Sequence, residues 1–262
     1  MDDPVARLAS YYSQQAEVWE QRLAGLLHPL GLKLLERLPT AGIGVVLDLG
    51  TGSGTLLPAI AARAPQALVV GIDRAEGMVR LADSSFGRAV ADAARLPLTD
   101  ASVDAAVLAF MLFHLPRPGA ALQEVHRTLR PGGTVAVGTW TAASQPANEV
   151  WAQILDSYGA RPDDVLARHD LMDTPEKIDG LLRRAGFETM ATAVEREPDV
   201  MDLEEFLWRR TSVGSAGRRF RSLPNEARAA CLAAARERLA GLDPEDFTDP
   251  QEAVLAWARK FV

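Results

Sequence analysis

The stretch that most constrains the fold is Val45–Leu57, VVLDLGTGSGTLL. A short apolar run, Val45 to Leu47, predicts a buried strand, and Asp48 and alternating glycines follow it. Apolar residues at helical spacing resume after Thr55. A strand, a glycine turn and a helix are the means by which α/β folds bring backbone close to a ligand. Glycine suits such a turn because it accepts φ > 0 and has no Cβ, and free N–H groups at a helix start favour a negative ligand group.

Glycine spacing separates three interpretations of this turn. A tight strand-to-helix turn without a ligand requires no fixed spacing, whereas a dinucleotide site has G-x-G-x-x-G. Counted from Gly50, that fingerprint would place its third glycine at position 55, which is Thr55. The observed G-x-G-x-G after an acidic strand end resembles motif I, D/E-x-G-x-G-x-G, of the class I S-adenosylmethionine-dependent methyltransferases. The resemblance implies that the cofactor contacts Asp48, Gly50, Thr51 and Gly52.

The second strand is predicted at residues 67–72, and an acidic residue follows it directly. This residue lies roughly 20 residues after the glycines, the offset at which an acid that binds a ribose is expected. This is Asp73, whose carboxylate could accept from both ribose hydroxyls; the alternative is a helix N-cap. The surrounding run, GIDRAEGM, resembles the family pattern GxDxSxxM, which implies that Met78 lies against the adenine. Arg74 stands where a small polar residue is commoner, so we group it with the cofactor-binding residues without assigning a role.

A third predicted strand, residues 86–91, leads into a further family-like run. Residues 92–104, DAARLPLTDASVD, resemble D-A-x-x-L-P-x-x-D-x-S-x-D. The resemblance implies that the Asp92 carboxylate accepts from the adenine amine and that the Ala93 N–H faces a ring nitrogen. The alternative for Asp92 is a solvated loop carboxylate. The run L-x-x-E-V-x-R-x-L-R-P-G-G-x over residues 122–134, between a helix predicted at 120–129 and a strand predicted at 134–140, strengthens the resemblance.

The fourth predicted strand, residues 103–110, is followed by MLFHL, which resembles the motif IV region that often ends in H-H-L; Phe113 replaces the first His. The resemblance implies that Ala109 and Phe110 lie beside the methionine end of the cofactor. His114 is the one candidate catalytic residue, because an imidazole titrates near neutral pH and could take the acceptor's proton. The alternative is that His114 caps or packs against the next helix.

Helices are predicted before the first strand and before the last. Apolar residues at a spacing of three to four predict one helix over residues 4–27 and a further one at 30–38. In the resembled family such helices often cover the cofactor, which makes Tyr11 and Tyr12 candidate cofactor contacts and Trp19 a weaker one; the alternative is that these aromatic residues face the core. Residues 199–241 are predicted to be helical and to shape access for the acceptor. The residues singled out there are Phe206, Trp208, Arg218 and Arg219.

The resemblance implies an α/β, Rossmann-like sheet of seven strands in the order 3-2-1-4-5-7-6, with the last strand antiparallel. The sixth and seventh strands are predicted at residues 187–197 and 252–261. We therefore expect an N-terminal helical cover at residues 1–42. The methyltransferase domain is then expected at residues 43–262, including the helical insertion at about 199–241.

Composition indicates where in the cell the protein is expected and which partners are disfavoured. Cys231 is the single cysteine, so no intramolecular disulfide can form, and MDDPVARLASYY lacks the basic-then-apolar layout of a signal peptide. No apolar run reaches the length of a membrane span. These features predict a cytoplasmic protein without a membrane partner. The net charge of −7, with scattered positive charges, argues against a nucleic acid as substrate.

The predicted reaction is methyl transfer from S-adenosyl-L-methionine, which leaves S-adenosyl-L-homocysteine, to a small-molecule acceptor without a metal. A nucleic-acid amine acceptor usually brings N/D-P-P-Y/F after strand four, and AFML stands here. We expect a monomer or a homodimer. Two alternatives remain open: a regulator that binds S-adenosylmethionine without catalysis, and an NAD-dependent oxidoreductase, which would leave Asp92 and the L-P-x-x-D-x-S run unexplained.

Overall fold

The computed structural model describes residues 3–39, 41–163 and 169–261. The chain forms two compact units, which are described separately below. Unit 1 comprises Met1–Ala142, Leu166–Arg196 and Glu252–Val262, and unit 2 comprises Ala143–Val165 and Glu197–Gln251.

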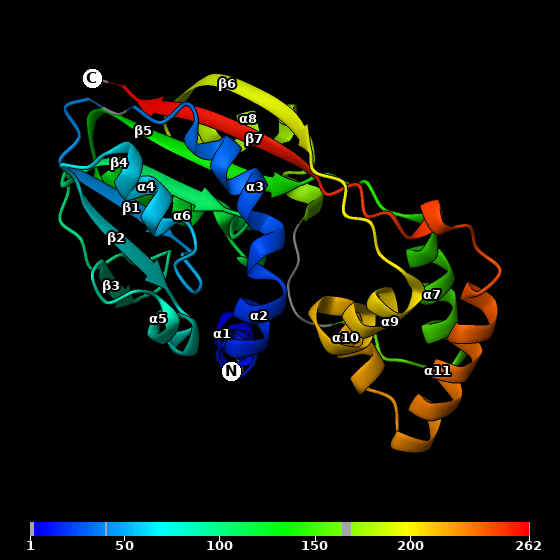
Figure 1. The fold of residues 1–262 in the computed structure, drawn as a ribbon. Helices are drawn as coiled ribbons and strands as arrows, with labels where there is room; N and C mark the ends of the chain where they lie inside the picture. Colours follow the sequence, from blue (N-terminus) through cyan, green and yellow to red (C-terminus); the bar gives the residue numbers. More distant parts are fainter. Residues whose placement is uncertain (1–2, 40, 164–168, 262) are drawn as a thin grey trace. The chain divides into compact units, whose positions relative to one another are not determined.

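A twisted, mostly parallel sheet forms the centre of unit 1 (Figure 1). Its strands lie in the order β3-β2-β1-β4-β5-β7-β6, and β7 runs antiparallel to both neighbours. This confirms the predicted Rossmann-like topology. The carboxyl ends of β1, β2 and β4 lie at one edge, and the chain order reverses between β1 and β4, which is where such folds bind ligands. The strands are β1 Val45–Leu49, β2 Leu68–Asp73, β3 Gly87–Val90, β4 Val103–Ala109, β5 Leu129–Trp140, β6 Phe187–Arg196 and β7 Glu252–Lys260.

Helices cover both faces of this sheet and bury the central strands (Figure 1). The side chains of Leu47, Val107 and Ala136 have no exposed area, as expected for parallel strands covered on both faces. The helices that follow the strands are α4 Leu57–Arg63, α5 Glu76–Leu81, η1 Leu112–His114, α6 Pro118–Thr128, η2 His169–Leu171 and α8 Pro175–Arg184.

The predicted single helix over residues 4–27 is wrong. The segment forms α1 Pro4–Gln14, α2 Ala16–Arg22 and α3 Ala24–Leu35, with breaks at Gln15 and Leu23. The breaks let α1 and α2 contact α5, while α3 packs on β4, β5 and β7. The Trp257 indole N–H donates to the Leu34 carbonyl (2.8 Å), which fixes the last turn of α3 on the sheet. The apolar spacing continues through both breaks, so periodicity could not reveal them.

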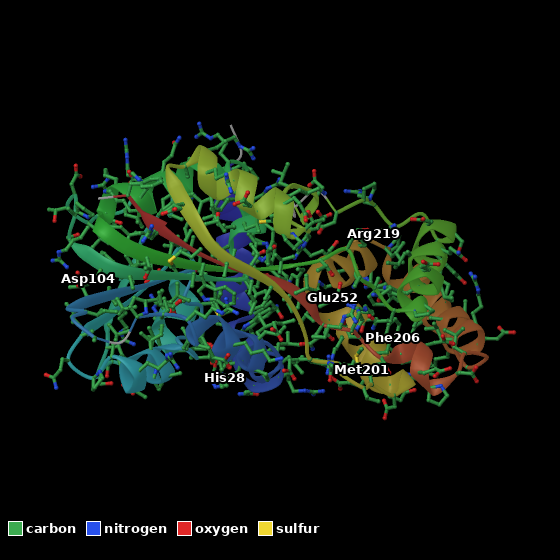
Figure 2. The ribbon with its side chains drawn as sticks, turned by 90° about the horizontal axis from the view of Figure 1, so that it is seen from above. His28, Asp104, Met201, Phe206, Arg219 and Glu252 are labelled. Carbon is green, nitrogen blue, oxygen red and sulfur yellow. The ribbon has the colours of Figure 1, made fainter. Side chains whose placement is uncertain are left out.

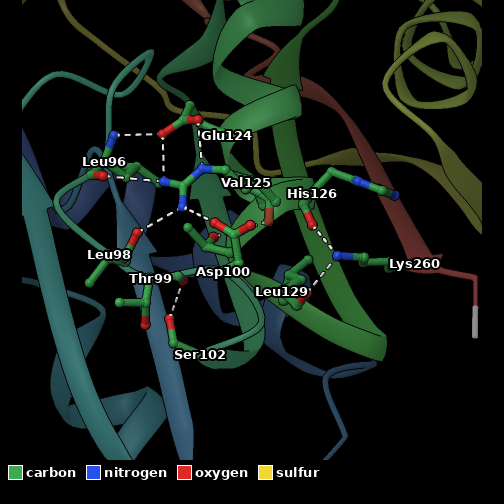
Figure 3. Close-up of polar contacts among 12 residues, drawn as sticks. Leu96, Leu98, Thr99, Asp100, Ser102, Glu124, Val125, His126, Leu129 and Lys260 are labelled. Carbon is green, nitrogen blue, oxygen red and sulfur yellow. Dashed lines mark hydrogen bonds and ion pairs between the residues drawn. The ribbon is translucent and has the colours of Figure 1, made fainter.

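One arginine joins the two family-like runs at residues 92–104 and 122–134. The Arg127 guanidinium binds the Glu124 carboxylate, the Asp100 carboxylate and the carbonyl groups of Leu96 and Leu98 (Figure 3). Glu124 in turn accepts from the Leu96 N–H (2.9 Å). These bonds hold the loop after β3 against α6, and thereby fix the path of the chain just after Asp92.

Unit 2 is helical and has a hydrophobic core of its own. Its elements are α7 Pro146–Ser157, α9 Leu203–Ser212, α10 Gly214–Arg221, α11 Asn225–Leu239 and η3 Pro244–Phe247. Phe206 and Met201 are buried in this core (Figure 2), so Phe206 is a packing residue of unit 2. Arg218 pairs with Asp163 (2.6 Å) and Arg219 with Asp156. That Trp208, Arg218 and Arg219 shape acceptor access stays a prediction. No helix in the described part of the chain is long and apolar enough to cross a membrane.

Candidate functional site

The glycines after β1 have different structural roles. Gly50, Gly52 and Gly54 all have positive φ values, of 75°, 57° and 82°. A Cβ on Gly50 would lie 2.5 Å from the Met111 Cβ, and one on Gly54 would lie 2.8 Å from the Ala82 Cβ. These two glycines therefore allow close packing. A Cβ on Gly52 would meet nothing within 4 Å, so of these three glycines Gly52 is the one that borders open space.

Asp48 carries a buried and strongly perturbed carboxyl. It lies near the end of β1, is 2 % exposed, and accepts a 2.6 Å hydrogen bond from the Thr51 hydroxyl. Burial raises the pKa of Asp48 to about 7, the Thr51 hydrogen bond opposes this rise, and the negative charge of Asp73 adds to it. Because no cationic side chain among the described residues pairs with the charged form, a positively charged group would stabilise it.

Asp73 ends β2 and connects the glycine turn to the start of α5. Its Oδ2 accepts from the Gly52 N–H (2.9 Å) and its Oδ1 from the Ala75 N–H (2.8 Å). Ala75, and not Asp73, is the N-cap residue of α5, so the N-cap alternative is wrong. Burial raises the pKa of Asp73, although these N–H groups oppose the rise. Each carboxylate oxygen has a further lone pair that a hydroxyl can use.

Asp92 is not merely a solvated loop carboxylate. Its Oδ1 accepts from the Ala94 N–H (2.9 Å) and its Oδ2 binds Arg74 Nη1 (3.0 Å). Ala93 beside it is buried. Arg74 also binds Asp3 Oδ2 (2.5 Å), which sequence reasoning missed; the only signal was that Asp3 precedes a helix.

The end of β4 meets the first helix through a hydrogen bond between side chains. Tyr12 Oη lies 3.1 Å from His114 Nε2, and the two rings stand edge to face with centroids 5.5 Å apart. The start of α6 has Arg117 as its N-cap residue without a side-chain cap, so His114 does not cap that helix. Phe110 has a φ of 56° and its ring lies 4.5 Å from that of Trp140, while Ala109 before it is half-buried.

The remaining predicted contacts lie under or in the N-terminal helices. Met78 is 3 % exposed and packs with Ala16 and Ala75, against which Tyr12 and Trp19 also pack. Tyr11 is half-buried, with its ring 5.6 Å from that of Tyr12. The contact of Met78 with adenine and those of Tyr11 and Tyr12 with the cofactor stay predictions. Among the residues that the structure describes, no three His, Cys, Asp or Glu side chains are grouped to hold a metal ion.

Comparisons with known proteins give the family. A family described as "Methyltransferase domain" matches residues 47–137. The ubiquinone/menaquinone biosynthesis C-methyltransferase of Syntrophotalea carbinolica is 37 % identical over 134 residues, which are 48 % of this chain and 55 % of that protein. The protein of that name from Acidiphilium cryptum is 32 % identical over 168 residues, covering 56 % of this chain and 67 % of its own length. The match thus spans only about half of the first of these relatives.

A solved structure from Bacillus halodurans, described only provisionally as a methyltransferase, shares the fold. It superposes with a TM-score of 0.61 at 21 % identity and covers 88 % of this chain and 99 % of its own. The family match over residues 47–137 and the relative from Acidiphilium cryptum, whose length this chain covers to 67 %, show the family. The chain therefore belongs to the class I S-adenosylmethionine-dependent methyltransferases.

Proposed function

We propose that this enzyme methylates a small-molecule acceptor without a metal, and that the residues at the carboxyl ends of β1, β2 and β4 hold the cofactor. The observation that carries this proposal is the buried Asp48, which has a pKa of about 7 and is followed by the open cradle at Gly52. S-adenosylmethionine, when bound, supplies a methyl group on a sulfonium. A cationic cofactor with an amino group suits a site with two closely spaced carboxylates, because it offsets the charge that burial disfavours.

Specific parts are proposed for the polar residues of the cofactor site. Asp48 favours a cationic group near the glycine turn, and Thr51 holds its carboxylate in place. Asp73 offers its remaining lone pairs to the ribose hydroxyls, and Asp92 with the Ala93 N–H offers an acceptor and a donor to the adenine edge. The proposed set is completed by Gly50, Gly52, Arg74, Met78, Ala109, Phe110, Tyr11 and Tyr12.

The acceptor's proton is proposed to leave through His114. The Tyr12 hydrogen bond orients the His114 ring at the end of η1, in the loop that follows β4. An imidazole so placed can take the proton of a hydroxyl or amine acceptor as the new bond to the methyl carbon forms. The rest of the catalysis is alignment of the acceptor atom with the methyl group in a site that excludes water.

Two relatives named for ubiquinone/menaquinone biosynthesis support a small-molecule acceptor. The test is a screen of fractionated metabolite extract with S-adenosylmethionine that carries a labelled methyl group. We expect the label in a small-molecule fraction, less label with Asp73→Asn at a limiting concentration of the cofactor, and no effect of a chelator. Label only in protein or nucleic acid would overturn the proposed acceptor class, and tight cofactor binding without transfer to any fraction would favour a non-catalytic regulator.

Once an acceptor is found, three variants test the role of His114. His114→Ala should lower turnover ~10²-fold or more and leave cofactor affinity unchanged. Tyr12→Phe should lower turnover less, because the imidazole remains but its orientation is no longer fixed. His28→Ala, on α3 (Figure 2), is the matched control and should leave turnover unchanged. Near-normal turnover by His114→Ala would show that His114 is structural and that alignment alone carries the reaction.

A further inference from the structure

Arg74 joins two segments of unit 1 that are far apart in the sequence. Its Nη2 lies 2.5 Å from Asp3 Oδ2, and its Nη1 lies 3.0 Å from Asp92 Oδ2. Both carboxylates are already oriented by backbone, because Asp3 Oδ1 accepts from the Val5 N–H (3.0 Å) and Asp92 Oδ1 from the Ala94 N–H (2.9 Å). The guanidinium therefore bridges the N-cap residue of α1 and the carboxylate proposed to read the adenine.

The other end of α1 is held by contacts of a different kind. The Ser13 Oγ accepts from the Gly77 N–H (3.2 Å). A Cβ on Gly77 would lie 2.4 Å from the Ser13 carbonyl oxygen, so only glycine allows α5 to approach α1 this closely. Tyr12 binds His114 beyond β4. An 11-residue helix is about 16 Å long, enough to reach from the end of β2 to the end of β4.

The two ends of α1 differ in their sensitivity to salt. The Asp3 and Arg74 side chains are 46 % and 31 % exposed, so dissolved ions can screen their attraction. The contacts between Ser13 and Gly77 involve an uncharged hydroxyl and close backbone packing, which salt weakens little. The first turn of α1 is therefore the end whose attachment depends more on the salt concentration.

We propose that Arg74 is a positioning residue that latches the first turn of α1 beside the adenine end of the cofactor site, and that this latch governs how fast the cofactor enters and leaves. The inference rests on the cofactor residues proposed above. The family pattern has a small polar residue more often at this position, and the latch gives Arg74 a function there. The Arg74 side chain holds α1 in place through Asp3 and keeps the Asp92 carboxylate oriented. The latch affects the free-energy barrier that the cofactor crosses both on entry and on release. Its loss should therefore change the rates of binding and release more than the affinity.

Asp3→Asn tests the latch, because asparagine still caps α1 but has no charge for Arg74. Glu76→Gln is the matched control: it also removes one carboxylate beside α5, but Glu76 pairs with Arg80 and not with α1. Stopped-flow binding and displacement of S-adenosylhomocysteine give the two rates. At about 50 mM salt we expect Asp3→Asn to raise both rates about two- to five-fold, and at about 500 mM salt we expect it to match the wild type. Glu76→Gln should match the wild type at both.

Limited trypsin digestion without any ligand gives an independent measurement. Cleavage after Arg7, within α1, should be faster in Asp3→Asn than in the wild type at low salt, and equally fast at high salt. Equal rates and equal salt dependence in the wild type, Asp3→Asn and Glu76→Gln would overturn the latch. A rise in the release rate alone would also overturn it, since that marks a lost cofactor contact. Failure of the wild type to bind S-adenosylhomocysteine would overturn the proposed cofactor site, while the digestion would still test the latch.

Discussion

Asp48 and Asp104 lie on the paired strands β1 and β4 but near opposite ends of the sheet. Asp104 Oδ2 accepts from the Gly44 and Val45 N–H groups, both at 2.8 Å, and Oδ1 binds Arg130 at 2.6 Å. Partial burial works against ionisation of Asp104, but Arg130 and the two N–H groups outweigh it and lower its pKa. Asp48 has one hydroxyl donor and a raised pKa.

The charged form of an aspartate is thus stabilised by the chain at the amino end of the sheet, where Asp104 lies. At the carboxyl end the charge of Asp48 is only partly compensated. The amino end, where Asp104 joins β1, β4 and the start of β5, needs nothing from outside the chain. The carboxyl end keeps two carboxylates that burial disfavours, Asp48 and Asp73. Carboxyl groups with pKa values perturbed in this way are found more often at functional sites than elsewhere. The comparison therefore separates a carboxylate that the chain itself compensates from two that burial leaves disfavoured.

The largest expected effect is on stability, at the amino end. Asp104→Ala should lower the free energy of unfolding by about 3 kcal/mol, because it leaves two N–H groups and a guanidinium without their acceptor. Urea denaturation measures this. Asp100→Ala, whose side chain is 79 % exposed, is the control and should cost less than about 1 kcal/mol. Equal costs for the two variants would contradict the internal role of Asp104.

The second effect is on binding, at the carboxyl end. Asp73→Asn should weaken S-adenosylhomocysteine binding by about 2 kcal/mol, since the amide nitrogen cannot accept from a ribose hydroxyl. Calorimetry measures the affinity, and Asp104→Ala at a temperature where it stays folded should bind like the wild type. An equal loss of affinity for S-adenosylhomocysteine in Asp73→Asn and Asp104→Ala would contradict the proposed difference between the two ends of the sheet.

The smallest effect is a pH dependence that arises from Asp48. Its pKa is about 7 in the folded chain, against 3.8 for an unperturbed carboxyl, so the folded state holds the proton more tightly. The resulting stabilisation is complete below pH ~4 and is lost as the pH rises through about 7. Between about pH 6 and 8 the ligand-free protein should lose about 1 kcal/mol more unfolding free energy than Asp48→Asn. Parallel pH profiles for the two proteins would show that Asp48 is already compensated.

The local parts of the fold and site could be predicted from sequence, because their signals lie within a few residues. The positions of the glycine turn, of Asp73 and of the family-like run that begins at Asp92 follow from short motifs, and the resemblance supplied the strand order. The cofactor contacts of these residues stay predictions. The breaks at Gln15 and Leu23 carry no glycine or proline, and only contacts with α5 and the sheet explain them.

Long-range partners account for the rest. Arg127 binds backbone carbonyl groups about 30 residues earlier in the chain. Asp3 binds Arg74, although the whole of β1 lies between them in the sequence. To predict the burial of Phe206 from sequence, one would have to know that α7, from an earlier segment, packs with α11. Spacing in a sequence specifies which face of a helix is apolar, but not which neighbour covers it.

The strand order has a consequence for synthesis on the ribosome. β7 is made after every other strand, yet it lies between β5 and β6. Until residues 252–260 emerge, β5 lacks its outer neighbour and β6 has no strand to join, so the nascent chain carries unpaired strand edges while the helices of unit 2 are already made. Unpaired edges invite association with other chains. The last strand thus closes the sheet in a single late step, and a nascent chain stalled before Glu252 would expose both edges at once.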